Sequence, residues 1–491
     1  MGKEPPGRGP NPGPQLSGLF LIQFVSGLSA TVVATALPVI MGVLHTGSAA
    51  STWLVAATIL ANTTTTPLWG KLGDLFNRRS VLLCSITVFC AACVMAAAAA
   101  DFTGLLVARV LMGVGLGGIG ALCMVVVASL VEPRQRGRYS GYVLSAQTLG
   151  TMAGPAAGGF IAGLHPQGWR GCFLLVLPFG LLAWIIIRFM LPVKDLQPPG
   201  RAASAAKPDV AGGLLLMTGV ALTLLCVTHA AQSGGAWSVP VVAAGLAGLT
   251  LLGVASVFEW RAPDPVVPLR LLRGRPLGLS CLAAFAIGCT LFGGSVFISQ
   301  YLQLGLLIPS SAAGLLLMPM AAGTLAAAAA SGRWIAAGLS IRTLLIASTG
   351  SVVAGFGVLT AVNSSPVPLA VAGTILLGLG TGSTLQNLVI AAQHSAPAGM
   401  LSSVSATVMF FFSLGDSVGL IVLGALLSRW LNDAGQDSSS AYLAAIPQVF
   451  LISAGIAALG CAAVFVLPRR NRAPQPAQLN PVSPTYPQEH P

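Results

Sequence analysis

The sequence predicts an all-α polytopic membrane protein. Only 7% of its 491 residues are Asp, Glu, Lys or Arg, and 55% are hydrophobic, whereas soluble domains carry about 25% charged residues. Uncharged apolar runs recur between residues 18 and 467, and about twenty such residues are enough to cross a bilayer as a helix. Polar loops that carry most of the Lys and Arg residues separate the runs. We therefore expect 14 transmembrane helices.

The expected spans follow the apolar runs in chain order, and each one ends where charged or loop-forming residues resume. Two longer polar loops separate the spans into groups of six, two and six, and paired six-helix halves with a site at their interface are a common transporter design. The spans are expected at residues 18–40, 50–70, 80–100, 104–131, 139–163, 170–191, 209–231, 238–259, 277–302, 311–331, 341–361, 367–392, 401–428 and 447–467.

This division predicts the organisation of the chain. Proline-rich ends with few apolar residues are expected to be disordered. The expected segments are a disordered segment at 1–17, a six-helix bundle at 18–192, a cytoplasmic loop at 193–208, two inserted helices at 209–260, a cytoplasmic loop at 261–276, a six-helix bundle at 277–467 and a disordered cytoplasmic tail at 468–491.

The positions of Lys and Arg predict the orientation. These residues concentrate in the cytoplasmic loops of multispanning proteins. With the N-terminus in the cytoplasm, all 24 Lys and Arg residues fall on the cytoplasmic side except Arg109, Arg170 and Arg429. An odd number of spans would place the C-terminal arginines on the wrong side, so we expect an even number and both termini in the cytoplasm.

Several classes of function are not supported by the sequence. The net charge of +12 is spread over the loops, so we expect no nucleic-acid partner. The nine cysteines lie in apolar runs, without partner histidines at metal-ligand spacing, and we expect no metal. We find neither a Ser-His-Asp set nor a glycine-rich phosphate loop, and we expect a carrier rather than an enzyme, with a small molecule and membrane lipids as its partners.

A glycine-rich run lies within the fifth expected span. Glycine and proline weaken a helix, but in a membrane small residues let a neighbouring helix approach closely. The run is therefore either a tight packing seam or a hinge that moves during function. The residues concerned are Gly150, Gly154, Pro155, Gly158 and Gly159.

The loop after the second expected span carries one acid among bases, Gly70-Lys-Leu-Gly-Asp74-Leu-Phe-Asn-Arg78-Arg79. The positive-inside rule alone explains the bases but not Asp74. We expect Gly70, Asp74, Arg78 and Arg79 to form a cytoplasmic gate, a latch with the other half that is made and broken during transport.

Two charged residues lie within expected spans, where charge is costly. Arg109, in the fourth span, either extends to the outer interface or faces a cavity or a carboxylate. Asp416 lies near the middle of the span at 401–428. It either carries a proton during transport or is a structural partner for Arg109 or for backbone groups.

Together these motifs resemble the Major Facilitator Superfamily, and within it the fourteen-span drug:proton antiporters (EmrB/QacA-like multidrug efflux transporters). The spacing from Gly150 to Gly159 resembles the antiporter motif of its drug exporters, and the loop from Gly70 to Arg79 resembles its cytoplasmic loop signature, with Asn77 in place of a glycine. In the fourth span, Met112 replaces the glutamine that follows the family's buried arginine, here Arg109.

The first expected span departs from this family. It runs Leu28-Ser-Ala-Thr31-Val-Val-Ala-Thr-Ala-Leu-Pro38, whereas the family carries an acid where this chain has Ser29. That acid is a natural proton carrier, so its replacement leaves the coupling residue open. In the penultimate span, Asp416 replaces a glycine that is usual in the family and could take over this role, with Arg109.

The resemblance implies a secondary transporter of the inner (plasma) membrane. It implies export of small hydrophobic or amphipathic compounds such as drugs and antibiotics by alternating access, with the proton gradient as energy source and no cofactor, and an adaptor protein if the host has two membranes. A non-drug carrier or a transport-deficient, sensor-like relative is the alternative, because of Ser29. The expected cavity residues are Ser29, Thr31, Arg109, Gln147, Gln386, Asn387 and Asp416.

Overall fold

The structure of the protein is a computed structural model, and its described part is helical. It describes residues 13–44, 48–131, 135–165, 167–192, 196, 210–232, 239–261, 267, 269–308, 310–362, 366–394, 396, 400–433 and 439–468. Of the expected disordered segment 1–17, residues 13–17 belong to the first helix, and the rest lies outside these residues, as does the expected tail 468–491 except for its first residue.

The first helices form one bundle. They are α1 (Gly13–Val43), α2 (Ser48–Leu75), α3 (Arg78–Ala98), α4 (Phe102–Leu130), α5 (Arg136–Leu164) and α6 (Trp169–Met190). Two of them begin at side-chain caps, which satisfy backbone N–H groups that have no partner within the helix. The Asn77 side chain accepts from the N–H of Arg79 at 3.0 Å, and Asp101 accepts from the N–H of Gly104 at 2.9 Å.

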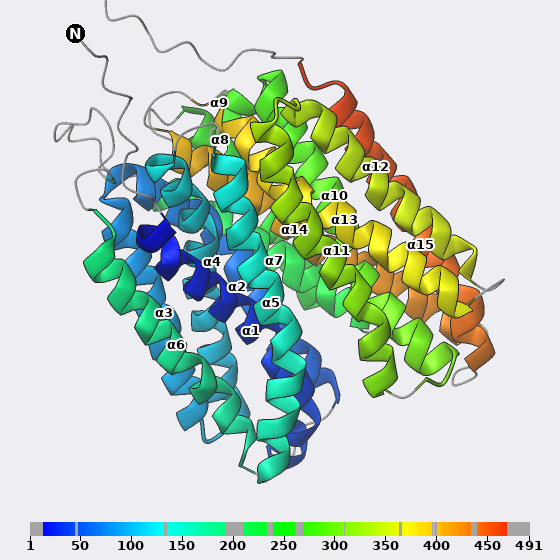
Figure 1. The fold of residues 1–491 in the computed structure, drawn as a ribbon. Coiled ribbons are helices and arrows are strands. Elements are labelled where there is room, and N and C mark those ends of the chain that lie inside the picture. Colours follow the sequence, from blue (N-terminus) through cyan, green and yellow to red (C-terminus); the bar gives the residue numbers. More distant parts are fainter. Residues whose placement is uncertain are drawn as a thin grey trace, which may run out of the picture.

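The later helices form a second bundle beside the first (Figure 1). They are α10 (Arg275–Gln300), which continues as the π-helical turn η2 (Tyr301–Gly305), α11 (Ser310–Ala336), α12 (Ile341–Thr360), α13 (Pro366–Gln393), α14 (Leu401–Asp433) and α15 (Ser439–Phe465). Between the bundles in sequence lie α7 (Val210–Gln232), α8 (Val239–Arg261) and the short α9 (Leu269–Leu272), which falls within the expected loop 261–276.

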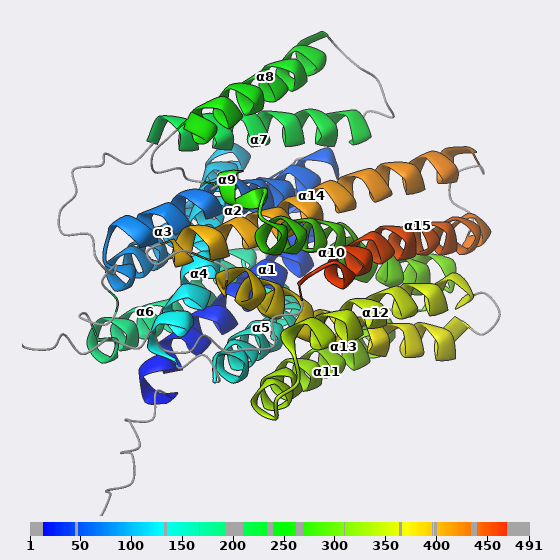
Figure 2. The ribbon, with the colours of Figure 1, turned by 90° about the horizontal axis from the view of Figure 1, so that it is seen from above.

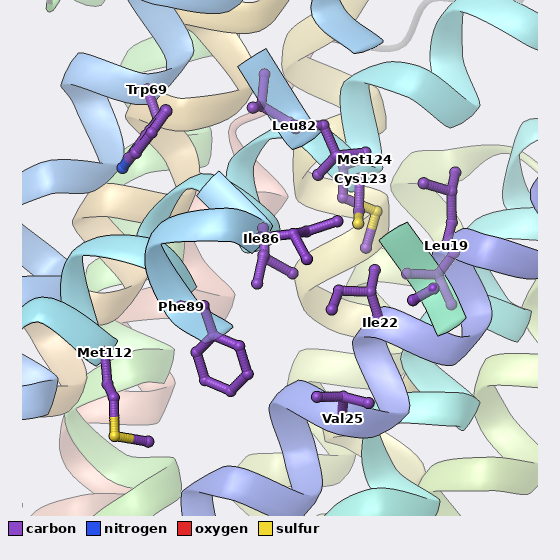
Figure 3. Packing of buried hydrophobic residues seen from close by; sticks show 14 of the residues in the cluster. Leu19, Ile22, Val25, Trp69, Leu82, Ile86, Phe89, Met112, Cys123 and Met124 are labelled. Atoms are coloured by element: carbon purple, nitrogen blue, oxygen red, sulfur yellow. The ribbon is translucent and has the colours of Figure 1, made fainter. Parts of the chain in front are cut away.

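Apolar side chains fill the interior of each bundle. In the first bundle they come chiefly from α1, α3 and α4, and Figure 3 shows how they face one another. The labelled members are Leu19, Ile22, Val25, Trp69, Leu82, Ile86, Phe89, Met112, Cys123 and Met124. A separate cluster, which includes Phe356 and Phe450, fills the second bundle. The first cluster also includes side chains of the second bundle, such as Leu345, Leu388 and Val404, so apolar packing continues from one bundle to the other.

The expectation of 14 transmembrane helices is corrected by the structure. Within the described residues, 11 helices are long and apolar enough to cross a membrane, and Gly212–Val227 of α7 is a shorter apolar helix. Neither α2 nor α5 is among the 11, since α2 contains four successive threonines and α5 is rich in glycine and polar residues. The sequence interpretation counted every long uncharged run as a span, although uncharged polar residues also lower hydropathy.

Candidate functional site between the two bundles

Asp74 joins the two bundles at the arginine-rich end of the molecule. It lies in the last turn of α2, where its carboxylate faces the first turn of α14. Its Oδ1 accepts the backbone N–H of Ser402 at 3.0 Å, and its Oδ2 accepts the N–H of Ser403 at 2.7 Å and the Ser403 hydroxyl at 2.5 Å. These N–H groups have no partner within the helix, and the positive end of the helix dipole favours a carboxylate there.

The arginines beside Asp74 complete this arrangement. Arg78 Nε donates to Ser402 Oγ at 3.2 Å, and its Nη1 donates to Ser129 Oγ on α4 at 2.7 Å. Its Nη2 lies 3.8 Å from Asp74 Oδ1. Arg79 instead donates to the carbonyl of Leu191 at 3.1 Å, within its own bundle. We refer to Asp74, Arg78, Ser402 and Ser403 as the latch.

Close backbone packing surrounds the latch. A Cβ atom at Gly70 would lie 2.2 Å from Cβ of Ala406, and one at Gly73 would lie 3.3 Å from Cβ of Ser402. Burial raises the pKa of Asp74, whereas its hydrogen bonds from Ser403 and Ser402 lower the pKa. The latch thus holds a charged group out of water by surrounding it with donors. Of the expected gate residues, Gly70, Asp74 and Arg78 meet α14, and Arg79 does not.

A second polar contact between the bundles lies about three helical turns deeper and was missed by the sequence interpretation. Thr63 on α2 is 0% exposed, and its Oγ1 lies 2.6 Å from Oγ of Ser413 and 3.5 Å from Oγ of Ser417 on α14. The run of four threonines was a signal, because hydroxyl groups in a membrane helix often bond to a neighbouring helix. The next three threonines bond within α2 instead.

The glycine-rich run of α5 packs against α1, within the first bundle. A Cβ atom at Gly150 would lie 2.0 Å from the carbonyl oxygen of Phe24, and one at Gly154 would lie 1.9 Å from Oγ1 of Thr31. Gly158 is buried, and its carbonyl accepts from Cys172 Sγ at 3.7 Å. Pro155 and Gly159 fall within α5, but their surroundings lie outside the described part of the chain. The described glycines form a seam between helices of one bundle.

The same seam recurs in the second bundle, between α10 and α14. A Cβ atom at Gly415 would lie 2.1 Å from the carbonyl oxygen of Phe285, and one at Gly419 would lie 1.9 Å from that of Cys289. Gly415 and Gly419 have the spacing of Gly150 and Gly154. The two bundles therefore repeat one packing device, and α14 is the counterpart of α5.

The structure places Arg109 and Asp416 in different bundles. Arg109 is 4% exposed, its Nε donates to the carbonyl of Leu54 on α2 at 3.1 Å, and its Nη1 has no hydrogen-bond partner. Asp416 is partly exposed and lies next to Cys289 of α10, where a Cβ atom at Gly288 would lie 3.1 Å from the Asp416 nitrogen. The described contacts of Arg109 thus point to α2, and those of Asp416 to α10.

The other expected cavity residues are dispersed. In the first bundle Ser29 is buried and its hydroxyl has no partner, whereas Thr31 donates to the carbonyl of Thr151 at 2.9 Å. Gln147 is partly exposed, and its carbonyl packs against Gly27. In the second bundle Gln386 and Asn387 are buried on α13, where they donate to Ser331 Oγ at 2.8 Å and to the carbonyl of Ser383 at 2.5 Å. No group of metal-binding residues is found in the described part.

Comparison with known proteins agrees with this architecture. Residues 19–420 match the family described as the Major Facilitator Superfamily. The chain is 28% identical over 437 residues to the multidrug transporter protein MdtP of Bacillus subtilis (strain 168), covering 88% of this chain and 78% of that protein. It is 27% identical over 470 residues to the efflux pump dotC of Dothistroma septosporum, covering 93% of this chain and 77% of that protein.

Two solved structures share the fold. The human organic anion transporter MFSD10 (TETRAN) aligns with a TM-score of 0.65 at 17% identity, covering 93% of this chain and 100% of that one. The proton:xylose symporter XylE aligns with a TM-score of 0.62 at 14% identity, covering 93% of this chain and 95% of that one. At these identities the likeness concerns the fold alone.

Proposed function

The chain belongs to the Major Facilitator Superfamily, and we propose that it exports small hydrophobic or amphipathic compounds, such as drugs and antibiotics, across the inner (plasma) membrane. Proteins of this family are transporters rather than enzymes. The relatives named as a multidrug transporter and an efflux pump support compounds of this kind as substrates. The sequence motifs that resemble those of drug:proton antiporters support the direction of transport.

The latch is the observation that carries the mechanism. It joins α2 of one bundle to α14 of the other through a buried carboxylate and two backbone N–H groups. Such a contact can hold the bundles together at the arginine-rich end, which the positive-inside rule places in the cytoplasm. We propose that this arrangement closes the cytoplasmic side and that release of Asp74 opens it. Alternating access is then a movement of one bundle against the other around a midplane site.

The energy source that we propose is the proton gradient, without a cofactor. Asp416 supports this proposal because it is a carboxyl group within a membrane helix, where charge is costly and usually serves transport. It also lies at the glycine seam between α14 and α10, so that a change in its charge would act on the helix that carries the latch. Arg109 is the second buried charge that could respond to protonation.

Transport by the purified protein tests this function. The protein would be reconstituted into vesicles under an imposed pH gradient, and a panel of dyes and antibiotics would be screened for movement. We expect saturable transport of at least one lipophilic compound, and we expect it to stop when the gradient is collapsed. A panel without any transported compound would contradict drug export.

A non-drug carrier is the second candidate, and Ser29 is the observation that favours it. This residue occupies the position of an acid in the resembled exporters and is buried without a hydrogen-bond partner. A metabolite or lipid-like solute would then be the cargo. Movement of such solutes, but of no drug, in the same vesicles would support this candidate.

A further inference from the structure

The pair α7 and α8 lies along one side of the contact between the bundles. Figure 2 shows the pair beside α2 and α14, on the side of the molecule away from α5 and α11. Val220 and Leu224 of α7 are buried against Leu60 of α2 and Phe410 of α14. One helix of the pair therefore contacts both bundles at once.

The seam beneath α7 contains a polar contact. Thr63 and Ser413 form their hydroxyl contact there, and Leu414 and Val418 of α14, which flank this contact in sequence, pack against the α7 cluster. Hydrocarbon offers no hydrogen-bond partners, so polar contacts at membrane depth are stable where protein shields them. The helix α7 packs on the residues next to this contact, which is where such a shield is needed.

On the opposite side, no further helix like α7 lies over the α5–α11 seam among the residues that the structure describes. Gly332 of α11 packs against Arg138 of α5, just as Gly70 of α2 packs against α14. Thr63 lies two helical turns before Gly70, and Leu325 lies two helical turns before Gly332. Leu325 is therefore the counterpart of Thr63 on the opposite side. Leu325 is partly exposed, whereas Thr63 is 0% exposed. Both helices also carry large exposed apolar side chains: Leu149 and Met152 on α5, and Leu315 and Met318 on α11.

The α7–α8 pair is built as a unit. A Cβ atom at Gly219 of α7 would lie 3.0 Å from the Leu252 nitrogen of α8, and one at Gly248 would lie 2.8 Å from the Thr223 nitrogen of α7. Small residues allow this close approach. The pair can therefore lie across the seam as one rigid body while the bundles move beneath it.

We propose that α7 seals the α2–α14 seam against the membrane, and that compounds dissolved in the membrane reach the space between the bundles through the α5–α11 seam. The route of the compounds rests on the proposed export function. The seal itself rests only on the packing of α7. Access to the transport path is then one-sided, although the two bundles repeat each other.

Accessibility of two equivalent positions tests the seal. Thr63→Cys and Leu325→Cys would each be introduced into the full chain with its nine native cysteines replaced, and the proteins would be reconstituted into lipid vesicles. A pyrene maleimide that partitions into the hydrocarbon would be the probe, and a sulfonated, water-soluble maleimide would report exposure to water. Because a buried site reacts only when the structure opens locally, we expect the lipophilic probe to label position 63 at least about tenfold more slowly than position 325.

Shortening the α7 side chains tests whether α7 causes the difference. Val220→Ala with Leu224→Ala should raise the labelling of position 63 several-fold, whereas Leu214→Ala, at an exposed position of α7, should not. Equal labelling of positions 63 and 325 would overturn the seal. So would an unchanged rate at position 63 in the α7 variants. The comparison of the two cysteines with intact α7 remains decisive if the shortened variants fail to fold.

A transport measurement tests the route separately. Leu325→Trp should slow export of a lipophilic dye, whereas Leu246→Trp, at an exposed position of α8, should not. If position 325 is labelled faster than position 63 but no compound is exported, the seal is supported and the proposed function is contradicted. Export with equal labelling would support the function and overturn the seal. Unimpaired export by Leu325→Trp would overturn the route.

Discussion

Oδ2 of Asp74 accepts the backbone N–H of Ser403 at 2.7 Å, although the two residues lie 329 positions apart in the chain. Asp74 lies in the last turn of α2 of the first bundle, and Ser403 lies in the first turn of α14 of the second. The bond exists only while these two helix ends meet. A contact of this kind has two discrete states, made and broken, which is the property that a rigid-body transition between bundles requires.

Replacing Asp74 by Asn should weaken the latch. An amide is similar in size, but it presents N–H donors where the carboxylate accepts from Ser402 or Ser403, so one backbone donor loses its partner. Hydrogen bonds to charged groups contribute about 1.5–3 kcal/mol, so we expect a clear shift towards separated helix ends. Spin labels at Phe76 and Leu339, exposed residues at this end of the two bundles, would show longer distances.

The matched control for this variant is Asp101→Asn. Asp101 also caps a helix N-terminus, but its partner, the N–H of Gly104, lies in the same bundle. The oxygen of an asparagine amide caps a helix about as well as a carboxylate does, so this variant should change neither the stability of α4 nor the distance between the bundles. Equal distance distributions in Asp74→Asn and the unmodified protein would show that the latch does not hold the bundles together.

The glycine seams should tolerate no side chain. Gly154→Ala and Gly419→Ala each place a Cβ atom 1.9 Å from a neighbouring oxygen, and overpacking of this kind costs about 1–3 kcal/mol. Both variants should therefore show lower thermal unfolding midpoints in detergent. Gly350→Ala and Gly357→Ala on α12, where no atom lies within 4 Å, should behave like the unmodified protein.

This experiment also separates a seam from a hinge. If these glycines form a packing seam, any loss of transport in the Gly154 and Gly419 variants should be accompanied by a loss of stability. A hinge at Gly154 would instead give normal unfolding midpoints with impaired transport. The second result would contradict the assignment of these glycines to packing.

The sequence predicted the helical class, because low charge and long apolar runs leave few other solutions, and its motifs predicted the Major Facilitator Superfamily. It also identified Asp74, since an acid in a basic loop is not explained by topology. The partners of Asp74 could not be predicted, because Ser402 and Ser403 contribute backbone N–H groups and serines of ordinary appearance. The number of spans was wrong, because uncharged polar residues in α2 and α5 were counted as apolar.

The repeated seam shows a different limit of sequence reasoning. Gly415 and Gly419 have the spacing of Gly150 and Gly154, yet only packing against Phe285 and Cys289 identifies them as the counterpart seam. Thr63 was missed because a threonine in a helix usually bonds to its own backbone, as Thr65 and Thr66 do. Which hydroxyl group crosses to another bundle depends on tertiary structure.

Asp416→Asn should uncouple transport from the pH gradient. The amide keeps the shape of the side chain beside Cys289 but cannot bind or release a proton in the working range of pH. We expect gradient-driven accumulation to be lost, while exchange of labelled for unlabelled substrate without a gradient is retained. Asp101→Asn, which removes an acid outside the membrane interior, should keep both activities. Unchanged dependence on pH in the Asp416 variant would exclude this residue as the proton carrier.

Thr63→Val should weaken the deeper contact between the bundles. Valine has nearly the volume of threonine but cannot bond to Ser413, and hydrogen bonds between membrane helices contribute about 0.6 kcal/mol on average, with about 1.7 kcal/mol as a maximum. The shift in spin-label distances should therefore be smaller than in Asp74→Asn. Thr58→Val is the matched control, because the Thr58 hydroxyl donates to the carbonyl of Arg109 within the first bundle at 3.0 Å.

A double-mutant cycle tests whether Thr63 and Ser413 act together. The effects of Thr63→Val and Ser413→Ala should be non-additive, since each substitution removes the same contact. Additive shifts would mean that the two hydroxyl groups act independently and that the deeper contact does not join the bundles.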